Sequence, residues 1–88
     1  MIIEYRDSFK TDLLKIKDTR LYTKTTFLIE DIKKARTIED ISNIIKLKGY
    51  KNYYRIRLGD YRIGTIVTNK NIIMIRILHR KEIYRYFP

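Results

Sequence analysis

Apolar and polar residues alternate along residues 53–64, which read YYRIRLGDYRIG, on both sides of Gly59-Asp60. The apolar positions are Tyr54, Ile56, Leu58, Tyr61 and Ile63. Successive side chains of a strand point to opposite faces, so the pattern predicts two strands, Tyr53–Leu58 and Tyr61–Thr68, joined by a tight turn. One face of this hairpin is then apolar. The other carries three arginines within about ten residues.

Two helices are predicted ahead of this hairpin, after a short strand at residues 2–5. The first helix carries apolar residues at helical spacing, and Asp7 or Ser8 is the expected N-cap, because short polar side chains accept from the free N–H groups of the first turn. Lys17-Asp18-Thr19 separates it from a longer second helix. The apolar stripe of the second helix is Leu21, Thr25, Leu28, Ile32 and Ala35.

The remaining segments complete an α+β pattern, in which a strand and two helices precede four strands. Residues 37–41 are expected to form a single turn, residues 44–48 a strand, and the nearly continuous apolar run at residues 72–78 a central strand covered on both faces. Residues 80–86 form a terminal turn of helix or stay extended. We expect a single domain over residues 1–88, with the two helices on one face of a mainly antiparallel sheet and the arginines on an open opposite face.

Charge is distributed unevenly along the chain. The formal net charge is +10, and residues 46–88 hold eleven Lys/Arg against two Asp/Glu, whereas residues 1–45 hold nine against eight. Six of the eight tyrosines also lie in residues 46–88. Guanidinium groups pair with phosphate and tyrosine rings stack on unpaired bases, so a basic sheet rich in tyrosine indicates an RNA-binding surface. The alternative is a solvated outer face, which most charged strand faces are.

Several classes of protein are disfavoured. The chain has no cysteine, one histidine, no carboxylate pair at glycosidase spacing and no Gly-rich phosphate loop, so we expect neither a metal nor another cofactor. No apolar run approaches the roughly 20 residues of a membrane span, and the first residues are not a secretory signal. We therefore expect a cytoplasmic protein without a membrane partner.

RNA cleavage needs little beyond this inventory of residues, because the ribose 2′-OH supplies the nucleophile. The protein has to orient the 2′-OH, accept its proton, stabilise a dianionic phosphorane and protonate the leaving 5′ oxygen. Arginines supply the charge stabilisation. His79, Tyr84 or an arginine are the candidates for proton transfer, although a lone histidine is more often structural.

The order strand-helix-helix, followed by YRIRLGDYRIG, an apolar strand and LHRKEIYRYFP, resembles the RelE/ParE superfamily of toxins over essentially the whole chain. The terminal HRKEIYR resembles the RelE branch, whose members cleave messenger RNA in the ribosomal A site. This resemblance implies that Arg62 and Arg80 stabilise the transition state, that Arg55 and Arg57 position phosphate and assist proton transfer, and that Tyr84 stacks on a base. Relatives often have lysines at the positions of Arg55 and Arg57, and His79 is a catalytic candidate of lower rank.

Six further basic residues are assigned to contacts with the RNA: Lys46, Lys48, Lys51, Arg76, Lys81 and Arg85. The resemblance also implies a cognate protein antitoxin that covers the basic face, and binding of the complex to operator DNA only through that antitoxin. Two alternatives remain, a ParE-type poison of DNA gyrase that performs no chemistry and a degenerate RNA-binding relative. We expect residues 79–88 to be needed for cleavage, because they contain Arg80 and Tyr84. We expect them to be dispensable for folding, because their apolar content is modest.

Overall fold

A computed structural model describes residues 1–88 and contains one five-stranded sheet in the order β1-β5-β4-β3-β2. The elements are β1 (Ile2–Tyr5), α1 (Asp7–Lys15), α2 (Thr19–Lys34), a 3₁₀ turn η1 (Ile38–Asp40), β2 (Ile44–Lys46), β3 (Tyr53–Leu58), β4 (Tyr61–Thr68), β5 (Asn71–His79) and α3 (Ile83–Tyr86). β1 runs parallel to β5, and the other neighbours are antiparallel. The predicted α+β fold is confirmed, and the predicted strand at residues 44–48 ends two residues early, at Lys46.

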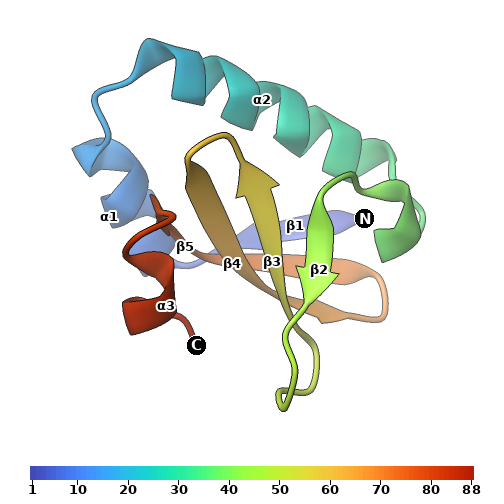
Figure 1. The fold of residues 1–88 in the computed structure, drawn as a ribbon. Coiled ribbons are helices and arrows are strands. Elements are labelled where there is room, and N and C mark those ends of the chain that lie inside the picture. Colours follow the sequence, from blue (N-terminus) through green and yellow to red (C-terminus); the bar gives the residue numbers. More distant parts are fainter.

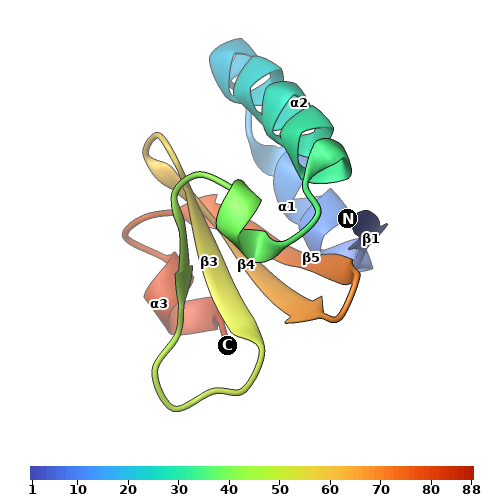
Figure 2. The same cartoon turned by 90° about the vertical axis from the view of Figure 1, so that its right-hand side faces the viewer.

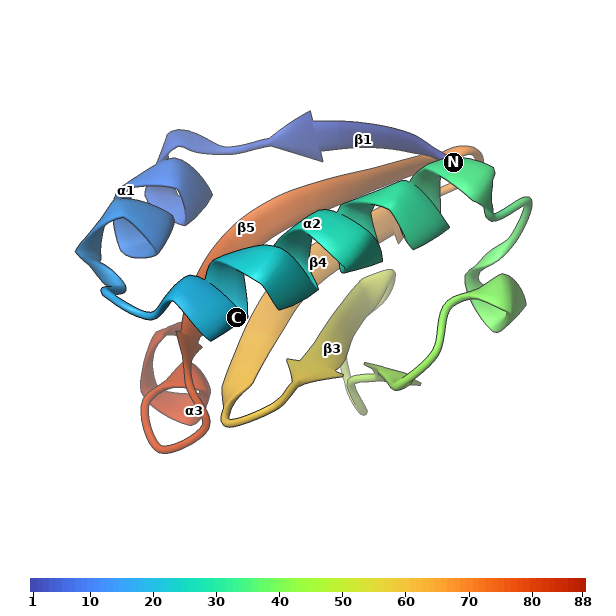
Figure 3. The same ribbon diagram turned by 90° about the horizontal axis from the view of Figure 1, so that it is seen from above.

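The two long helices lie on one face of the sheet (Figure 1), and α2 crosses above β4 and β5 (Figure 3). The main core lies between the helices and the sheet. Its fully buried members come from both layers and are Phe9, Ile32, Ile56, Ile63, Ile72, Met74 and Ile77. The predicted stripe of α2 is buried except for Leu28, which is half-buried, and Ala35 lies just past the helix as its C-cap. Asp18 caps this helix by accepting from the N–H groups of Arg20 and Leu21. No helix is long and apolar enough to cross a membrane.

Helix α1 begins differently from the prediction. Its N-cap is Arg6, and no side chain caps it, so the expected cap at Asp7 or Ser8 is wrong. Ser8 instead donates its hydroxyl hydrogen to the backbone oxygen of Ile75, 2.5 Å away. The Ser8 hydroxyl therefore bonds to the neighbouring strand β5 and does not cap its own helix.

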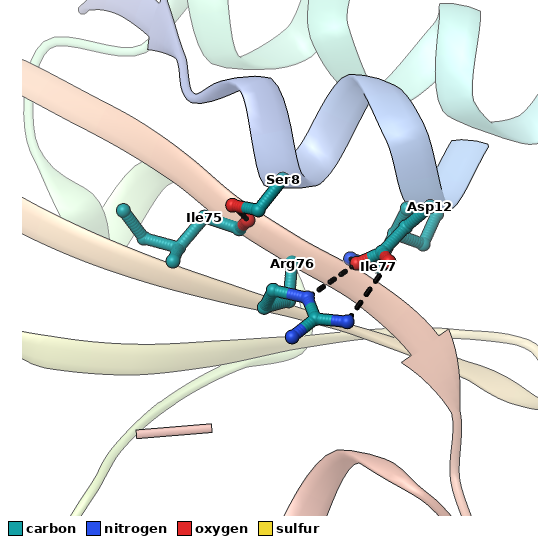
Figure 4. Close-up of polar contacts among 5 residues, drawn as sticks. All are labelled: Ser8, Asp12, Ile75, Arg76 and Ile77. Atoms are coloured by element: carbon teal, nitrogen blue, oxygen red, sulfur yellow. Dashed lines mark hydrogen bonds and ion pairs between the residues drawn. The ribbon is translucent and has the colours of Figure 1, made fainter. Parts of the chain in front are cut away.

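The reason is that β1 covers only part of the edge of β5. The pairing ends at Tyr5 opposite Met74, and α1 takes over from there. Asp12 accepts the N–H of Ile77 at 3.1 Å and holds Arg76 in a bidentate pair (Figure 4). A helix therefore satisfies the backbone groups that an exposed strand edge would leave free.

The opposite face of the sheet is not fully open, which corrects the sequence-based prediction. Helix α3 lies against it (Figure 1), and Ile83 and Phe87 are 0% and 4% exposed in a second small core with Leu47. A Cβ atom on Gly64 would collide with the ring of Phe87, so the glycine provides the space for this ring. The premise that residues 79–88 contribute little to the core is therefore wrong.

Candidate active site

The hairpin of β3 and β4 brings three arginines to the face that carries α3. Arg57 and Arg62 are directly opposite each other in the antiparallel register, and Arg55 is opposite Gly64. Ile56, between the two arginines of β3, is fully buried under the helices. The predicted separation into an apolar face and an arginine face is confirmed, and two like charges lie side by side across the strands, where they repel.

Two of the three guanidinium groups have defined contacts. Arg62 donates from one nitrogen to the backbone oxygens of Gly59 and Tyr61, at 2.8 and 2.9 Å. The guanidinium carbon of Arg55 lies 4.4 Å from the centre of the Tyr84 ring, a cation–π contact, and its Nε is buried without a hydrogen-bond partner. The sheet thus holds cationic donors in place without an acidic residue.

A hollow of about 390 Å³ lies over this cluster. Its lining residues are Asn43, Ile45, Arg55, Arg57, Arg62 and Tyr84. None of them carries a carboxylate, and none of the three arginines belongs to an ion pair. A hollow that holds three unpaired guanidinium groups attracts an anion that several of them contact at once, as phosphate does.

Two lining residues were missed by the sequence reasoning. Asn43 has a positive φ of 63°, a conformation that asparagine tolerates, and its backbone oxygen accepts the N–H of Arg57 at 3.0 Å. Ile45 is paired with Arg55 and remains 57% exposed. The signal for Ile45 was available, because an apolar residue beside the arginine face departs from the polar pattern of that face.

The other catalytic candidates lie elsewhere. Arg80 is exposed beside the β3–β4 turn, where its N–H donates to the oxygen of Asp60, and it does not line the hollow. His79 is paired with Tyr61 and packs edge-on against its ring, on the face that carries the long helices. It lines a separate hollow of about 490 Å³ together with Asp12 and Glu82. The structure therefore groups Arg55, Arg57, Arg62 and Tyr84, and separates them from His79.

Of the six basic residues assigned to RNA contacts, Arg76 is engaged within the protein. Its Nε and one terminal nitrogen contact the Asp12 carboxylate at 2.6 and 2.9 Å. These hydrogen bonds raise the pKa of the Arg76 guanidinium above its usual value, against the opposing effect of desolvation. The other five residues, Lys46, Lys48, Lys51, Lys81 and Arg85, are exposed.

Known proteins resemble this chain over its whole length. A family model described as ParE toxin of type II toxin-antitoxin system matches residues 3–84. The chain is also 40% identical to Toxin RelE3 of Methanocaldococcus jannaschii over 89 residues, which covers 100% of both chains. The chain belongs to the RelE/ParE family of type II toxins.

Solved structures agree with this toxin family. The toxin matches a RelB-RelE antitoxin-toxin complex from Methanococcus jannaschii with a TM-score of 0.82 and 39% identity, over 97% of this chain and 99% of that chain. An archaeal RelE-RelB complex from Pyrococcus horikoshii OT3 has the same fold, with a TM-score of 0.70 at 24% identity, over 90% and 93% of the two chains. The superfamily resemblance drawn from the sequence motifs is confirmed.

Proposed function

We propose that this toxin is an endoribonuclease that cuts messenger RNA in the ribosomal A site. One observation carries the proposal: three unpaired arginines and the exposed ring of Tyr84 line one hollow, in a chain similar over its full length to Toxin RelE3. Phosphate and base are the two parts of RNA that guanidinium groups and an exposed ring contact. Tyr84 is 72% exposed, so its ring is accessible to a base.

The chemistry uses the RNA itself as the nucleophile. The 2′ oxygen attacks the adjacent phosphorus as its proton leaves, the bond to the 5′ oxygen breaks, and that oxygen takes up a proton. The products are a 2′,3′-cyclic phosphate and a 5′-hydroxyl. Arg57 and Arg62 stabilise the dianionic phosphorane, and Arg55 positions phosphate while Tyr84 orients a base. These fixed donors supply charge stabilisation, the largest single effect in many enzymes.

Proton transfer is the weakest part of this site. The lining residues include no histidine and no carboxylate, and arginine and tyrosine are poor bases at neutral pH. Because the site has no good base, the reaction depends on messenger RNA that the ribosome already holds in place. Arg80 lies outside the hollow, beside the β3–β4 turn, and stabilises the transition state from that exposed position.

The proposed partners follow from this reading. A cognate antitoxin covers the basic face in the resting cell. Support comes from the two archaeal relatives, whose structures are complexes of RelE with RelB. The complex binds its operator DNA through the antitoxin, and the free toxin acts on ribosomes in the cytoplasm. A protein with such an excess of positive charge fits an acidic partner.

One observation favours a second function. The matching family model is described as ParE toxin. The resemblance to ParE-type members would imply a poison of DNA gyrase that performs no chemistry. Pulse labelling after induced expression separates the two. The nuclease reading expects protein synthesis to fall first, whereas the gyrase reading expects DNA synthesis to fall first, with gyrase trapped on cleaved DNA. A degenerate RNA-binding relative would leave messenger RNA intact when it is incubated with programmed ribosomes.

The direct test uses purified ribosomes programmed with a defined messenger RNA. The wild-type toxin is expected to leave a discrete A-site product with a cyclic phosphate end. Arg62→Ala is expected to slow this cleavage by about a hundred- to a thousand-fold while it keeps its fold. Arg20→Ala, which removes an exposed arginine from α2, is the matched control and should cleave normally. Normal cleavage by a folded Arg62→Ala protein would overturn the proposed site.

A further inference from the structure

The loop between β2 and β3 carries a basic surface that lies outside the arginine hollow. Residues 46–51 read KLKGYK, and they line a shallow hollow of about 380 Å³. No carboxylate occurs from residue 41 to residue 59, and none of the three lysines belongs to an ion pair. The loop projects beyond the sheet, at the end of the molecule farthest from α2 (Figure 2). Its three charges are therefore free for a partner.

The base of the loop is held firmly. The N–H of Leu47 donates to the oxygen of Tyr53, and the oxygen of Asn52 accepts from Val67, at 2.9 and 2.8 Å. Leu47 itself is buried in the second core. Gly49 and Asn52 have positive φ values of 79° and 66°, which glycine and asparagine adopt readily. The loop is thus anchored at both ends and presents its charges from a fixed position.

An aromatic ring is exposed among these charges. Tyr50 is 51% exposed, and its ring lies 5.8 Å from that of Tyr53, which stacks on Phe87 with 5.6 Å between ring centres. The inner rings support the outer ring from behind. Lysines that alternate with a supported, exposed ring are the combination that binds single-stranded nucleic acid, where bases stack and phosphates pair with cations. A carboxylate-rich peptide gains much less from the ring.

We propose that this loop, through Lys48, Tyr50 and Lys51, is a second RNA-binding surface that docks the toxin on ribosomal RNA. β3 rises about 3.3 Å per residue, so the end of the loop at Asn52 lies roughly 10 Å along the chain from Arg55 and roughly 16 Å from Arg57. A phosphate held between Arg57 and Arg62 does not reach the loop, and the loop contacts RNA away from the bond that is cut. It contributes to affinity for the ribosome and not to the chemical step. The inference rests on the proposed function for the identity of the RNA.

The test separates binding from cleavage by using the Arg62→Ala background, in which the messenger RNA stays intact. Sedimentation with purified ribosomes gives the dissociation constant over a series of salt concentrations. Lys48→Gln with Lys51→Gln is expected to weaken binding by about tenfold and to lower the salt slope by about 1.4, since each phosphate contact on a single strand contributes about 0.7. Tyr50→Leu is expected to weaken binding about fivefold and to leave the slope unchanged.

The matched control is Lys10→Gln with Lys34→Gln, which removes two charges from exposed positions on α1 and α2 that form no ion pair and should leave the salt slope unchanged. In the protein that keeps Arg62 and cleaves messenger RNA, the loop variants should raise the ribosome concentration that gives half-maximal cleavage. They should keep the cleavage rate at saturation within twofold. Thermal melts show that each variant folds. Unchanged affinity and slope in folded loop variants would overturn the proposal.

A poly-glutamate peptide distinguishes an RNA partner from an acidic protein. Tyr50→Leu should weaken ribosome binding and leave poly-glutamate binding unchanged. If the loop variants lose affinity for poly-glutamate alone, the surface serves an acidic protein and the proposal fails. The binding measurements do not depend on cleavage. A wild-type toxin that leaves messenger RNA intact would reject the proposed function, and the affinities of the loop variants for ribosomes would still support or overturn the role of the loop.

Discussion

Phe87 occupies the space that a side chain on Gly64 would need. The ring is 4% exposed and stacks on Tyr53, so the end of the described chain is fixed on the face of the sheet that holds the arginines. Ile83, fully buried one turn earlier, fixes the other end of α3. Between them Tyr84 reaches Arg55. The position of the exposed tyrosine therefore depends on a glycine in a neighbouring strand.

Gly64→Ala is expected to destabilise the protein by about 1–3 kcal/mol, because the added methyl group overpacks the site of the Phe87 ring. Urea unfolding measures this change. The same substitution in a Phe87→Ala background should cost much less, because the ring is gone. Equal costs in both backgrounds would show that the glycine acts through its backbone alone.

Tyr84 and Phe87 are expected to separate cleavage from stability. Tyr84→Ala removes a side chain that is 72% exposed and its cation–π contact with Arg55, so stability should change by less than about 1 kcal/mol, while cleavage falls with the loss of base stacking worth about 1–3 kcal/mol. Phe87→Ala empties a buried site and should lower the free energy of unfolding by about 3–5 kcal/mol. Urea melts give the change in stability of each variant, and ribosome cleavage assays give the cleavage rate of each. A destabilised Tyr84→Ala protein would contradict the assignment.

Asp12→Ala is expected to lower the free energy of unfolding by about 1–3 kcal/mol, because it leaves the N–H of Ile77 and the half-buried Arg76 guanidinium without their hydrogen-bond partner. Chemical denaturation at neutral pH measures the loss. Arg76→Met in the same background should recover part of it by removing the stranded charge, while the N–H of Ile77 stays unpaired. No recovery would mean that the backbone contact carries the whole effect.

Arg57→Gln is expected to stabilise the fold by about 0.2–1 kcal/mol, because it removes a like charge directly opposite Arg62. The gain should shrink at high salt, where the repulsion is screened. Thermal melts at two ionic strengths check both points, with the exposed Arg85→Gln as the control. Cleavage should fall in the same variant, so the site would be kept at a cost in stability.

Asp40 gives an expected pH dependence. Its carboxylate accepts from the N–H groups of Arg36 and Thr37, and these hydrogen bonds lower its pKa below the ordinary value of 3.8. A depressed folded-state pKa contributes stability above pH 3.8 that is lost as the pH falls through the folded value. Asp40→Asn should therefore be less stable than the wild type at pH 7, and denaturation between pH 7 and pH 2 should show the difference closing in acid.

The hairpin and its arginines could be predicted from the sequence because the geometry is local. A two-residue turn at Gly59-Asp60 fixes the register, and Arg57 and Arg62 are each two positions away from it, so they must face each other. Both strands were predicted with their observed bounds. The arginine part of the candidate site follows from that register alone.

The side chains of β5 could not be predicted in the same way. The pairing with β4 passes from Gly64–Arg76 to Thr65–Met74, which leaves Ile75 as an extra residue in a bulge. A bulge exchanges the faces of all later residues, and it places Ile77 and His79 on the face of the long helices. Arg76 is likewise held by Asp12, a residue 64 positions earlier. No local pattern indicates either contact.

The parallel pairing of β1 with β5 has a consequence for biosynthesis. Ile2 lies beside Asn71, so β1 has no partner strand until nearly all of the described chain has been made. Such distant pairing slows folding, because a long loop has to close first. Tyr84, which contacts Arg55, is synthesised later still, because it follows β5 in the sequence. The nascent polypeptide therefore passes through most of its own translation before the residues that line the hollow can come together.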